Sequence, residues 1–517
     1  MLFSRRPSLR IVMILVIALF ALHWTFFGPR IPRPRPDEWN SMSWSKPHGP
    51  PHHDHAAAHD DHRNPIARPH DADKAAPGDD ESVFKPIPPK ANASPTVSHV
   101  VGKPSKSPLP CATAEGIDDI VLIIKTGATE AVEKLPIHFN TTMECFPHVL
   151  IFSDFGETMD GHVIHDALSD VSEEIRLQDK DFELWRRLHE KGRADLRPDE
   201  LSTAHKLADP AAGTGNPESG GWRLDKFKNL PMLGKTLELK PDRKWYIFTD
   251  ADTFVSWSNM VEWTKKMDHT EQLYAGSAAV ISDQIFGHGG SGYLLSAATI
   301  KAGAKLYAEQ QKKWDEFASS HWAGDCVLAT ALETDLDIKL FWAFPMIQGG
   351  DPAIMDFSEI GYDKKVWCFP AMTYHHLSPE NIEAMWEFEQ EWTSSELGKK
   401  EPMRHGDIFK QWLLPKLKTK SEIREWSDWD NHAKDVVEDA EVNDTAGCRA
   451  KCEGNSTCME YSYSKGICKT YDKISLGTAD TDKLGIDSGW MMNRINNFVN
   501  DFDHCDGGET EGKWIIP

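Results

Sequence analysis

Three short runs of apolar residues, each ending in polar residues, stand out along the chain. They read IVLII at residues 120–124, VLIF at 149–152 and WYIF at 245–248, and they are followed by KTG, SD and TDAD. A run that is apolar at every position fits a strand buried on both faces, as in a parallel sheet covered by helices. Ligands of such sheets bind at the carboxyl ends of the strands, so the polar residues predict a functional site there.

Other segments predict helices and a further strand. Residues 286–311 give a glycine turn, a short strand and a helix, residues 321–332 give the start of another helix, and residues 336–346 give a strand. Ser378 is suited to cap a helix whose first residue is Pro379. Strands that alternate with helices indicate the α/β class.

The N-terminal residues have a different pattern. Three arginines within residues 1–10 precede an apolar run over residues 11–27. A run of this length is near the lower limit for a helix that spans a bilayer, and its basic flank predicts a cytoplasmic tail with the remainder in the lumen. The alternative is a cleaved signal peptide, although no small-residue cleavage site follows the run. We expect a single-pass type II signal anchor in the Golgi membrane, since short spans suit the thinner membranes of the early secretory pathway.

Residues 28–110 predict a disordered stem. They are dense in Pro, His, Asp and Ala and poor in aliphatic residues, so they cannot bury enough apolar area to offset chain entropy. The histidines at 48–62 could bind a metal or respond to pH, but a solvated spacer is the plainer interpretation.

Length, charge and cysteine content narrow the classes of function. A chain of 517 residues predicts at least two folded units. Its 57 Lys and Arg against 80 Asp and Glu give a formal net charge of -23, which repels nucleic acid. Nine cysteines fit an oxidising lumen, and one is left over if the others pair. That thiol leaves room for a covalent homodimer.

Asp250 and Asp252 stand one residue apart at the end of the third apolar run. Two carboxylates so close cannot both enter a core, and without a cation their joint ionisation is unfavourable. Mn²⁺ or Mg²⁺ resolves this conflict, because such ions bind few carboxylates together with the oxygens of a diphosphate. An Asp-x-Asp pair by itself is common in solvated turns, so the prediction depends on other motifs.

Six segments provide those motifs through their order along the chain. They are IVLIIKTG, LIFSDFGE, KWYIFTDADTFV, GHGGSGYLLS, GDCVLATAL and TYHHL, and they lie within roughly residues 117–377. Together they resemble glycosyltransferase family 31, the Fringe and core 1 β1,3-galactosyltransferase group. The resemblance implies a GT-A type, Rossmann-like α/β domain, which we expect over residues 111–430. It also implies sugar transfer from a UDP donor with inversion, using Mn²⁺ (or Mg²⁺) as cofactor.

The resemblance also implies roles for single residues. Asp250, Asp252 and His375 would hold the metal, with His376 as a competitor for the histidine position. Asp325 matches the general base that takes the proton of the acceptor hydroxyl. The remaining positions would contact the donor nucleotide or its sugar: Lys125, Thr126, Asp154, Asp250, Gly289 and Gly290.

Two positions depart from the family pattern. Ala251 replaces the middle acid of a triplet, and Gly324 replaces the acid before Asp325, so the proposed base depends on one carboxylate. Plainer interpretations stand beside each assignment. Asp325 could be an acid favoured by a helix N-terminus, His375 a core histidine, and the glycines a tight turn.

A second module is predicted over residues 431–517. Cys448 and Cys452 are four residues apart and would share one face of a helix, while Cys458 and Cys468 follow on strand-like segments. This resembles a PAN/apple domain, and the resemblance implies pairing of Cys452 with Cys458 and of Cys448 with Cys468. Zinc binding is the less favoured alternative. The pairing of the other cysteines is open: Cys111, Cys145, Cys326, Cys368 and Cys505.

The leading hypothesis is an inverting glycosyltransferase that moves a hexose or N-acetylhexosamine from a UDP-sugar to a glycan or glycoprotein acceptor, with a β1,3 linkage. The alternative is a catalytically inactive scaffold whose PAN/apple module binds glycan or protein, which the departures at Ala251 and Gly324 favour. A retaining or hydrolytic sugar enzyme on the same fold comes third.

Overall fold

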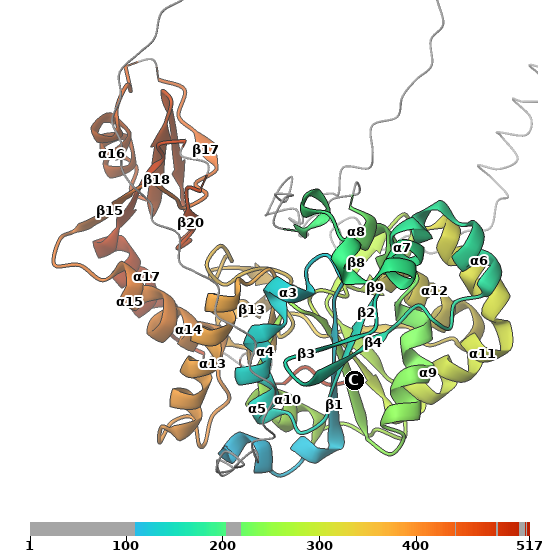
Figure 1. Ribbon diagram of the computed structural model, residues 1–517. Helices are drawn as coiled ribbons and strands as arrows, with labels where there is room; N and C mark the ends of the chain where they lie inside the picture. Colours follow the sequence, from blue (N-terminus) through green and yellow to red (C-terminus); the bar gives the residue numbers. More distant parts are fainter. Residues whose placement is uncertain (1–108, 203–218, 440, 482–483, 506–511, 513) are drawn as a thin grey trace, which may run out of the picture. The chain divides into compact units, whose positions relative to one another are not determined.

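The computed structural model describes residues 109–202, 219–439, 441–481, 484–505, 512 and 514–517 (Figure 1). The predicted cytoplasmic tail and anchor, and the predicted stem as far as residue 108, lie outside these residues. Within the described part, no helix combines the length and the apolar content needed to cross a membrane.

A mixed sheet of eight strands forms the centre of the larger domain, in the order β11-β7-β10-β5-β1-β2-β4-β3. Four neighbouring strands, β5, β1, β2 and β4, are parallel, which confirms the parallel sheet predicted from the apolar runs. The strands are β1 Ile120–Lys125, β2 Val149–Ser153, β3 Glu157–Met159, β4 His162–Asp166, β5 Trp245–Asp250, β7 Tyr274–Gly276, β10 Tyr293–Ser296 and β11 Leu340–Trp342.

Helices bury both faces of this sheet. On β1, Val121 and Ile123 pack into one apolar cluster, whereas Leu122 and Ile124 pack into another on the opposite face. The first cluster includes residues of α8 Gly220–Asp225, α9 Asn229–Leu239, α11 Ala297–Ser320 and α12 Gly324–Leu336. The second includes residues of α3 Ala131–Lys134, α5 Thr142–Cys145 and α10 Trp257–Thr264. Burial on both faces explains why the runs are apolar at every position.

Shorter elements complete the domain. Ser378 accepts a hydrogen bond from the Asn381 amide and caps α13, which begins at Pro379 as predicted. Two antiparallel pairs flank the sheet, namely β6 Phe254–Val255 with β14 Thr373–Tyr374, and β8 Ala278–Ile281 with β9 Gln284–Gly287. The other elements are α4 Pro136–Asn140, α6 Glu173–Gln178, α7 Glu183–Lys191, β12 Ile360–Gly361, β13 Lys364–Lys365, α13 Pro379–Ser394, α14 His405–Ile408 and α15 Leu414–Leu417.

A five-stranded antiparallel sheet with one helix against it follows, in the order β15-β21-β18-β19-β17. Its first strand, β15, begins before residue 431, so this sheet starts earlier in the chain than the predicted second module. The elements are β15 Ile423–Ser427, β16 Trp429–Asp430, β17 Asp435–Val436, α16 Thr445–Gly454, β18 Glu460–Ser464, β19 Ile467–Tyr471, β20 Thr478–Ala479, β21 Asp487–Met491 and α17 Met492–Phe502.

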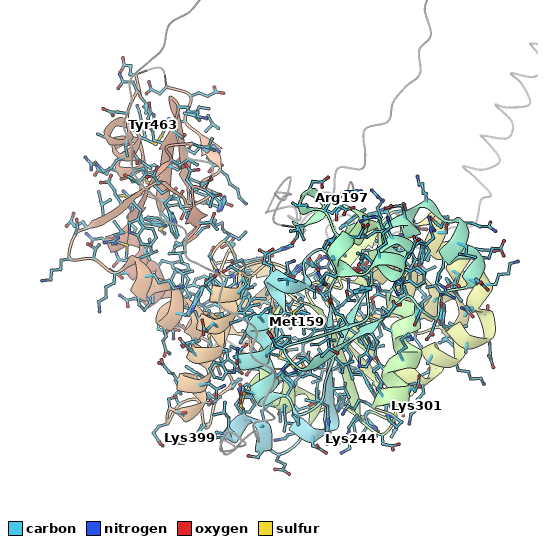
Figure 2. All side chains as sticks on the ribbon, viewed as in Figure 1. Met159, Arg197, Lys244, Lys301, Lys399 and Tyr463 are labelled. Carbon is cyan, nitrogen blue, oxygen red and sulfur yellow. A yellow bond between two sulfur atoms is a disulfide. The ribbon has the colours of Figure 1, made fainter. Side chains whose placement is uncertain are left out.

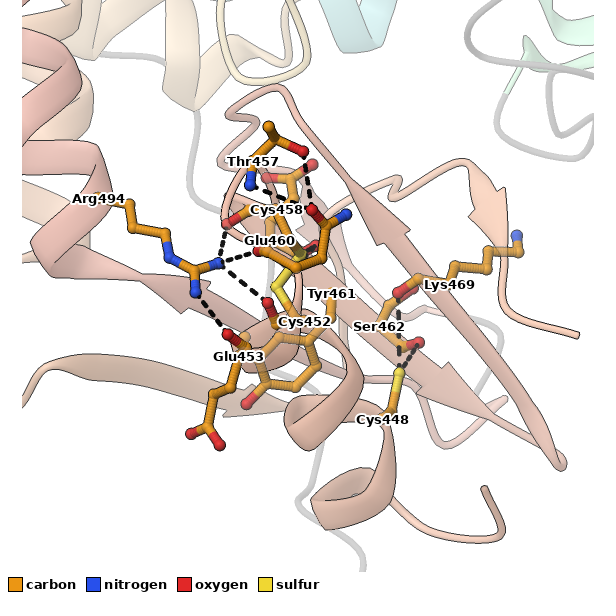
Figure 3. Close-up of a disulfide and its surroundings, with 12 residues drawn as sticks. Cys448, Cys452, Glu453, Thr457, Cys458, Glu460, Tyr461, Ser462, Lys469 and Arg494 are labelled. Carbon is orange, nitrogen blue, oxygen red and sulfur yellow. Dashed lines mark hydrogen bonds between the residues drawn. A yellow bond between two sulfur atoms is a disulfide. The ribbon is translucent and has the colours of Figure 1, made fainter. Parts of the chain in front are cut away.

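Two disulfides join α16 to this sheet and its connecting segment. They pair Cys448 with Cys468 and Cys452 with Cys458, as the resemblance to a PAN/apple domain implied. Figure 3 shows Arg494 of α17 directed at backbone carbonyls near the end of α16. An arginine in this place satisfies carbonyls that the last turn of a helix leaves without partners.

Two further disulfides join Cys111 to Cys145 and Cys368 to Cys505. Cys326 is the free cysteine and is buried within α12. Its thiol is therefore not presented at the surface, where it could form the disulfide of the covalent homodimer suggested above. A homodimer that lacks such a disulfide stays a prediction.

Candidate active site

The site begins where β1 and β5 end side by side. In the parallel register of these strands, Lys125 lies opposite Asp250, and Lys125 Nζ is 3.1 Å from Asp250 Oδ1. Figure 2 shows Lys244, which precedes β5, at the lower end of the sheet, so the carboxyl ends of the parallel strands point upward in this view. The helices α3 and α8 lie on that upper side in Figure 1. The structure therefore places these polar residues at the predicted edge.

A second ladder brings Asp252 to two histidines. β6 and β14 pair with Phe254 opposite Tyr374, and the same register continued by two residues sets Asp252 opposite His376. His375 Nε2 lies 3.1 Å from Asp252 Oδ1, and His376 Nδ1 lies 4.0 Å from Asp252 Oδ2. Asp252 precedes β6, and the two histidines follow β14. They meet because these two strands run antiparallel.

The backbone at His376 has an unusual conformation. Its φ is +63°, in the left-handed region that a residue with a side chain rarely adopts. This turn directs both neighbouring imidazoles at the same carboxylate. Backbone strain of this kind is often found where a functional geometry must be held.

Asp252, His375 and His376 form a group with the spacing of metal ligands. One ligand atom from each lies within 4.8 Å of the others, and no other such group occurs among the described residues. His375 Nδ1 and His376 Nε2 are buried and have no hydrogen-bond partner in that part of the chain. Asp250 is not in this group, and its Oδ1 lies 3.1 Å from Lys125 Nζ. The structure thus brings together Asp252 and the two histidines, and the metal set of Asp250, Asp252 and His375 stays a prediction.

Lysines balance part of the charge of the carboxylates. Lys134, the last residue of α3, places Nζ 3.0 Å from Asp252 Oδ2 and 2.8 Å from Glu130 Oε2. Burial tends to raise the pKa of Asp252, but the charge of Lys134 and the contacts with the histidines hold it well below its usual value. Burial raises the pKa of Asp250.

A network behind β1 extends this arrangement. Lys125 donates to Asp225 of α8 at 2.6 Å, and Lys228 lies between Asp225 and Asp154, at 3.5 and 3.4 Å. Asp154 is fully buried and accepts a hydrogen bond from the Ala128 amide at 2.8 Å. Its visible role is to fix the turn after β1, and a contact with uridine stays a prediction.

The net charge of this cluster matches a divalent cation. It contains five carboxylates and three lysines, so full ionisation leaves an excess of two negative charges. Within the cluster, burial raises the pKa of Asp154 and Asp250, whereas neighbouring lysines hold the pKa of Asp225 and Asp252 below its usual value. The residues are Glu130, Asp154, Asp225, Asp250, Asp252, Lys125, Lys134 and Lys228.

The glycine turn after β9 separates the histidines from Asp325. A Cβ on Gly290 would lie 2.1 Å from His375 Cε1, and the Gly289 amide donates to Asp325 Oδ2 at 2.8 Å. Thr253 donates to the Gly290 carbonyl at 2.6 Å and holds the turn in place. The predicted base and the histidine group therefore lie on two sides of one two-residue turn.

Asp325 has the environment of a group that can exchange protons near neutral pH. It is the second residue of α12, and burial raises its pKa to about 6. Gly324 before it is packed so tightly that a Cβ would lie 2.7 Å from the Asp225 carbonyl oxygen and 2.9 Å from Lys226 Cα. The chain has no room for an acidic side chain at this position, which gives a packing reason for Gly324.

The other departure also has a packing reason. Ala251 is 1% exposed and belongs to the apolar cluster on the α10 face of the sheet. An acid at this position would be buried among apolar side chains. The Ala251 carbonyl lies 2.8 Å from His138 Nε2, so a buried imidazole holds the backbone between the two aspartates.

Thr126, which the sequence predicts as a site residue, follows Lys125 and is almost fully buried. Its carbonyl accepts a hydrogen bond from Lys228 Nζ at 2.8 Å.

Other residues of the cluster are not predicted from the sequence. Lys134, His138 and Asp225 lie outside the recognised motifs. Their one signal in the sequence is a charged or polar side chain on a short helix, which is too common to use.

Comparisons with known proteins add little to this geometry. The chain matches no protein-family model and no curated protein. Among solved structures, a glycosyltransferase described as "involved in the glycosylation of the major capsid of PBCV-1" is similar over 34% of this chain and 81% of that chain, with 13% identity and a TM-score of 0.21. A TM-score this low does not establish a shared fold.

Proposed function

We propose that this protein is an inverting, metal-dependent glycosyltransferase. In this proposal it transfers a hexose or N-acetylhexosamine from a UDP-sugar to a glycan or glycoprotein acceptor in the Golgi lumen, with the β1,3 linkage that the family resemblance implies. The observation that carries the proposal is the position of Asp325 and of the Asp252, His375 and His376 group on two sides of the Gly289–Gly290 turn.

The fit of a divalent cation is supported by the donor set and by charge. One carboxylate and two imidazoles can hold it, because His375 Nε2 and His376 Nδ1 lie 3.1 and 4.0 Å from the oxygens of Asp252, and the cluster, when fully ionised, has an excess of two negative charges. A metal bound there would supply positive charge next to the departing diphosphate. Mn²⁺ is expected from the resemblance, although two imidazoles also suit Zn²⁺.

The chain's own residues would carry the other steps. Asp325 takes the proton of an acceptor hydroxyl, whose oxygen forms the new bond to the anomeric carbon of the donor sugar. The bond from that carbon to the diphosphate oxygen breaks in the same step, and its electron pair leaves with UDP. Lys125 and Lys134, which are paired with carboxylates of the cluster, would add positive charge beside the diphosphate. A single displacement inverts the anomeric configuration.

The test measures UDP release by the full-length protein with UDP-galactose, UDP-glucose, UDP-N-acetylglucosamine and UDP-N-acetylgalactosamine, together with a panel of glycoside acceptors. Mn²⁺, Mg²⁺ and Zn²⁺ are compared with a chelator. Asp252→Asn is expected to abolish turnover, whereas Asp337→Asn, at a side chain that is 91% exposed, leaves it intact.

The outcomes separate three hypotheses. Metal-dependent turnover that Asp252→Asn removes, with an inverted product, supports the proposal, whereas a retained configuration supports a retaining enzyme. Metal-dependent UDP binding without turnover of any donor supports the inactive scaffold. If UDP does not bind in any condition, the proposed donor site is wrong.

A further inference from the structure

His288 is the first residue after β9 and begins the turn that contains Gly289 and Gly290. Its ring packs at an angle against the ring of His375, with centroids 5.4 Å apart and planes inclined by 62°. The amide of the next residue, Gly289, donates to Asp325 Oδ2 at 2.8 Å. His288 therefore contacts one imidazole of the histidine group and adjoins the residue that holds the proposed base.

The hydrogen bonds at His288 Nδ1 fix the tautomer of the ring. The Ser291 amide donates to Nδ1 at 3.2 Å, and Ser291 Oγ lies 2.8 Å from the same nitrogen. A backbone N–H can only donate, so Nδ1 is an acceptor, and the proton of the neutral imidazole is then on Nε2. His288 therefore offers an Nε2–H group as its hydrogen-bond donor.

This donor is free and its direction is fixed. Among the residues that the structure describes, His288 Nε2 has no hydrogen-bond partner, and the side chain is half-buried. The Nδ1 end of the ring is closed, because a Cβ on Gly349 would lie 2.8 Å from Ser291 Oγ and 4.0 Å from His288 Nδ1. Thr373 Oγ1 also donates to the Ser291 carbonyl at 2.6 Å and holds this part of the turn in place. A ligand can therefore reach the ring through Nε2–H.

The proposed reaction places the transferred sugar beside this donor. In an inverting displacement, the base and the leaving group stand on opposite faces of the sugar. Asp325 is the proposed base, and the histidine group would lie next to the diphosphate through its metal. The sugar then lies over the turn that separates them, and His288 is the residue that begins this turn.

We infer that His288 Nε2 donates a hydrogen bond to a ring hydroxyl of the donor hexose and so helps to select the sugar that is transferred. The inference rests on the proposed function and adds to it the residue that recognises the sugar. A neutral N–H suits a hydroxyl, whereas the diphosphate is matched by cations. A fixed donor also discriminates between sugars, because it stays unpaired when the hydroxyl is missing or has the other configuration.

The experiment measures, by titration calorimetry with Mn²⁺, how tightly the full-length protein in detergent binds UDP, UDP-galactose, UDP-glucose and UDP-N-acetylglucosamine. His288→Ala should weaken binding of the preferred UDP-sugar about tenfold and narrow the preference between the epimers UDP-galactose and UDP-glucose. The affinity for UDP should not change, because UDP has no hexose. His288→Gln should recover most of the loss, since its amide keeps an N–H near the position of Nε2.

Monodeoxy analogues of the preferred UDP-sugar identify the hydroxyl. The analogue that lacks the contacted hydroxyl should bind equally to the wild type and to His288→Ala, because both partners of one hydrogen bond have then been removed. His148→Ala is the matched control and should leave every affinity unchanged. His148 is also a half-buried histidine with a hydrogen bond to a side chain, Asp118 at 2.8 Å, but it precedes β2 at the opposite edge of the sheet.

Two results would overturn the inference and leave the proposed function standing. If His288→Ala weakens the binding of UDP as much as that of the UDP-sugar, the ring serves the diphosphate. If His288→Ala keeps the wild-type affinities and sugar preference, while turnover still requires Asp252, the ring does not contact the sugar. Absence of binding of all three UDP-sugars to the wild type would instead reject the proposed function, and the inference with it.

Discussion

The ring of His375 fills the space beside Gly290, where a Cβ would lie 2.1 Å from His375 Cε1. Gly290 has no positive φ that would itself require glycine, so the need for glycine comes from the imidazole. The same turn supplies the Gly289 amide to Asp325. The absence of a side chain at Gly290 therefore sets the spacing between His375 and Asp325.

Gly290→Ala should displace His375 and weaken metal binding. We expect at least a tenfold loss of metal affinity, as is typical when the support of a ligand is disturbed, with a comparable loss of UDP-sugar turnover. Titration calorimetry with Mn²⁺ measures the affinity. Gly350→Ala is the control, because nothing lies within 4 Å of a Cβ there. Unchanged metal binding in Gly290→Ala would show that His375 is not a ligand.

The pH dependence of turnover should report Asp325. Burial raises the pKa of this carboxyl to about 6, and a general base acts in its ionised form. We expect kcat/KM to rise about tenfold per pH unit below 6 and to level off above it. Asp325→Asn should remove turnover and leave UDP binding intact. A profile that is flat between pH 4.5 and 7 would contradict the assignment.

The sequence predicted the sheet well because its signals are local. The run at residues 120–124 is apolar throughout since both faces of β1 are buried, and the ends of β1 and β5 follow from the change to polar residues. The meeting of Asp252 with His376 could not be predicted in the same way. It depends on the register between β6 and β14, which lie far apart in the sequence.

The departures at Ala251 and Gly324 also needed the structure. In the sequence they favour the inactive scaffold, because the family that the sequence resembles has acids there. In the structure Ala251 faces an apolar cluster and Gly324 faces backbone. The two positions are thus explained by packing, and neither removes a group from the cluster that surrounds Asp252.

Gly324→Ala should move the start of α12 away from α8. A Cβ there would lie 2.6 Å from Asn229 Nδ2 and 2.7 Å from the Asp225 carbonyl oxygen. We expect the free energy of unfolding to fall by about 1–3 kcal/mol and kcat to fall at least tenfold, because Asp325 shifts with the helix. Gly234→Ala on α9 is the matched helical control, with open space around it and a small gain in stability expected. Full kcat in Gly324→Ala would show that the helix start tolerates the shift.

Glu389 makes the stability of the domain dependent on pH. Its side chain is fully buried, and Oε1 accepts hydrogen bonds from Ser256 Oγ at 2.6 Å and Ser258 Oγ at 2.7 Å. Burial raises its pKa from 4.5 to about 7, so the folded state binds the proton more tightly than the unfolded chain does. Its contribution to stability is fully present below pH 4.5 and is lost as the pH rises through 7.

Glu389→Gln should remove this dependence, since the amide keeps an oxygen for the serines. Relative to the variant, the free energy of unfolding of the wild type should fall by up to about 3 kcal/mol between pH 4.5 and 7. Urea denaturation at each pH measures it. Glu396→Gln is the control, because the Glu396 side chain is 84% exposed. If the free energies of unfolding of the wild type and Glu389→Gln differ by the same amount at every pH, Glu389 is ionised in the folded state throughout this range.

Arg494 should control the stability of α16. Its guanidinium donates to the carbonyls of Cys452, Glu453, Asn455 and Cys458 at 2.7–2.9 Å (Figure 3). A positive charge at this end of a helix also interacts favourably with the helix dipole. Arg494→Met keeps most of the aliphatic stem but leaves these carbonyls without their donor.

We expect Arg494→Met to lower the free energy of unfolding of this sheet and helix by about 2–4 kcal/mol. Amide hydrogen exchange in α16 should accelerate, and the disulfide between Cys452 and Cys458 should become easier to reduce, while UDP-sugar turnover stays unchanged. Arg449→Met, which removes a half-exposed arginine paired with Glu425 at 3.4 Å, should change stability by less than about 1 kcal/mol. Equal exchange rates in α16 of both variants would show that the helix end is held by the disulfides and not by Arg494.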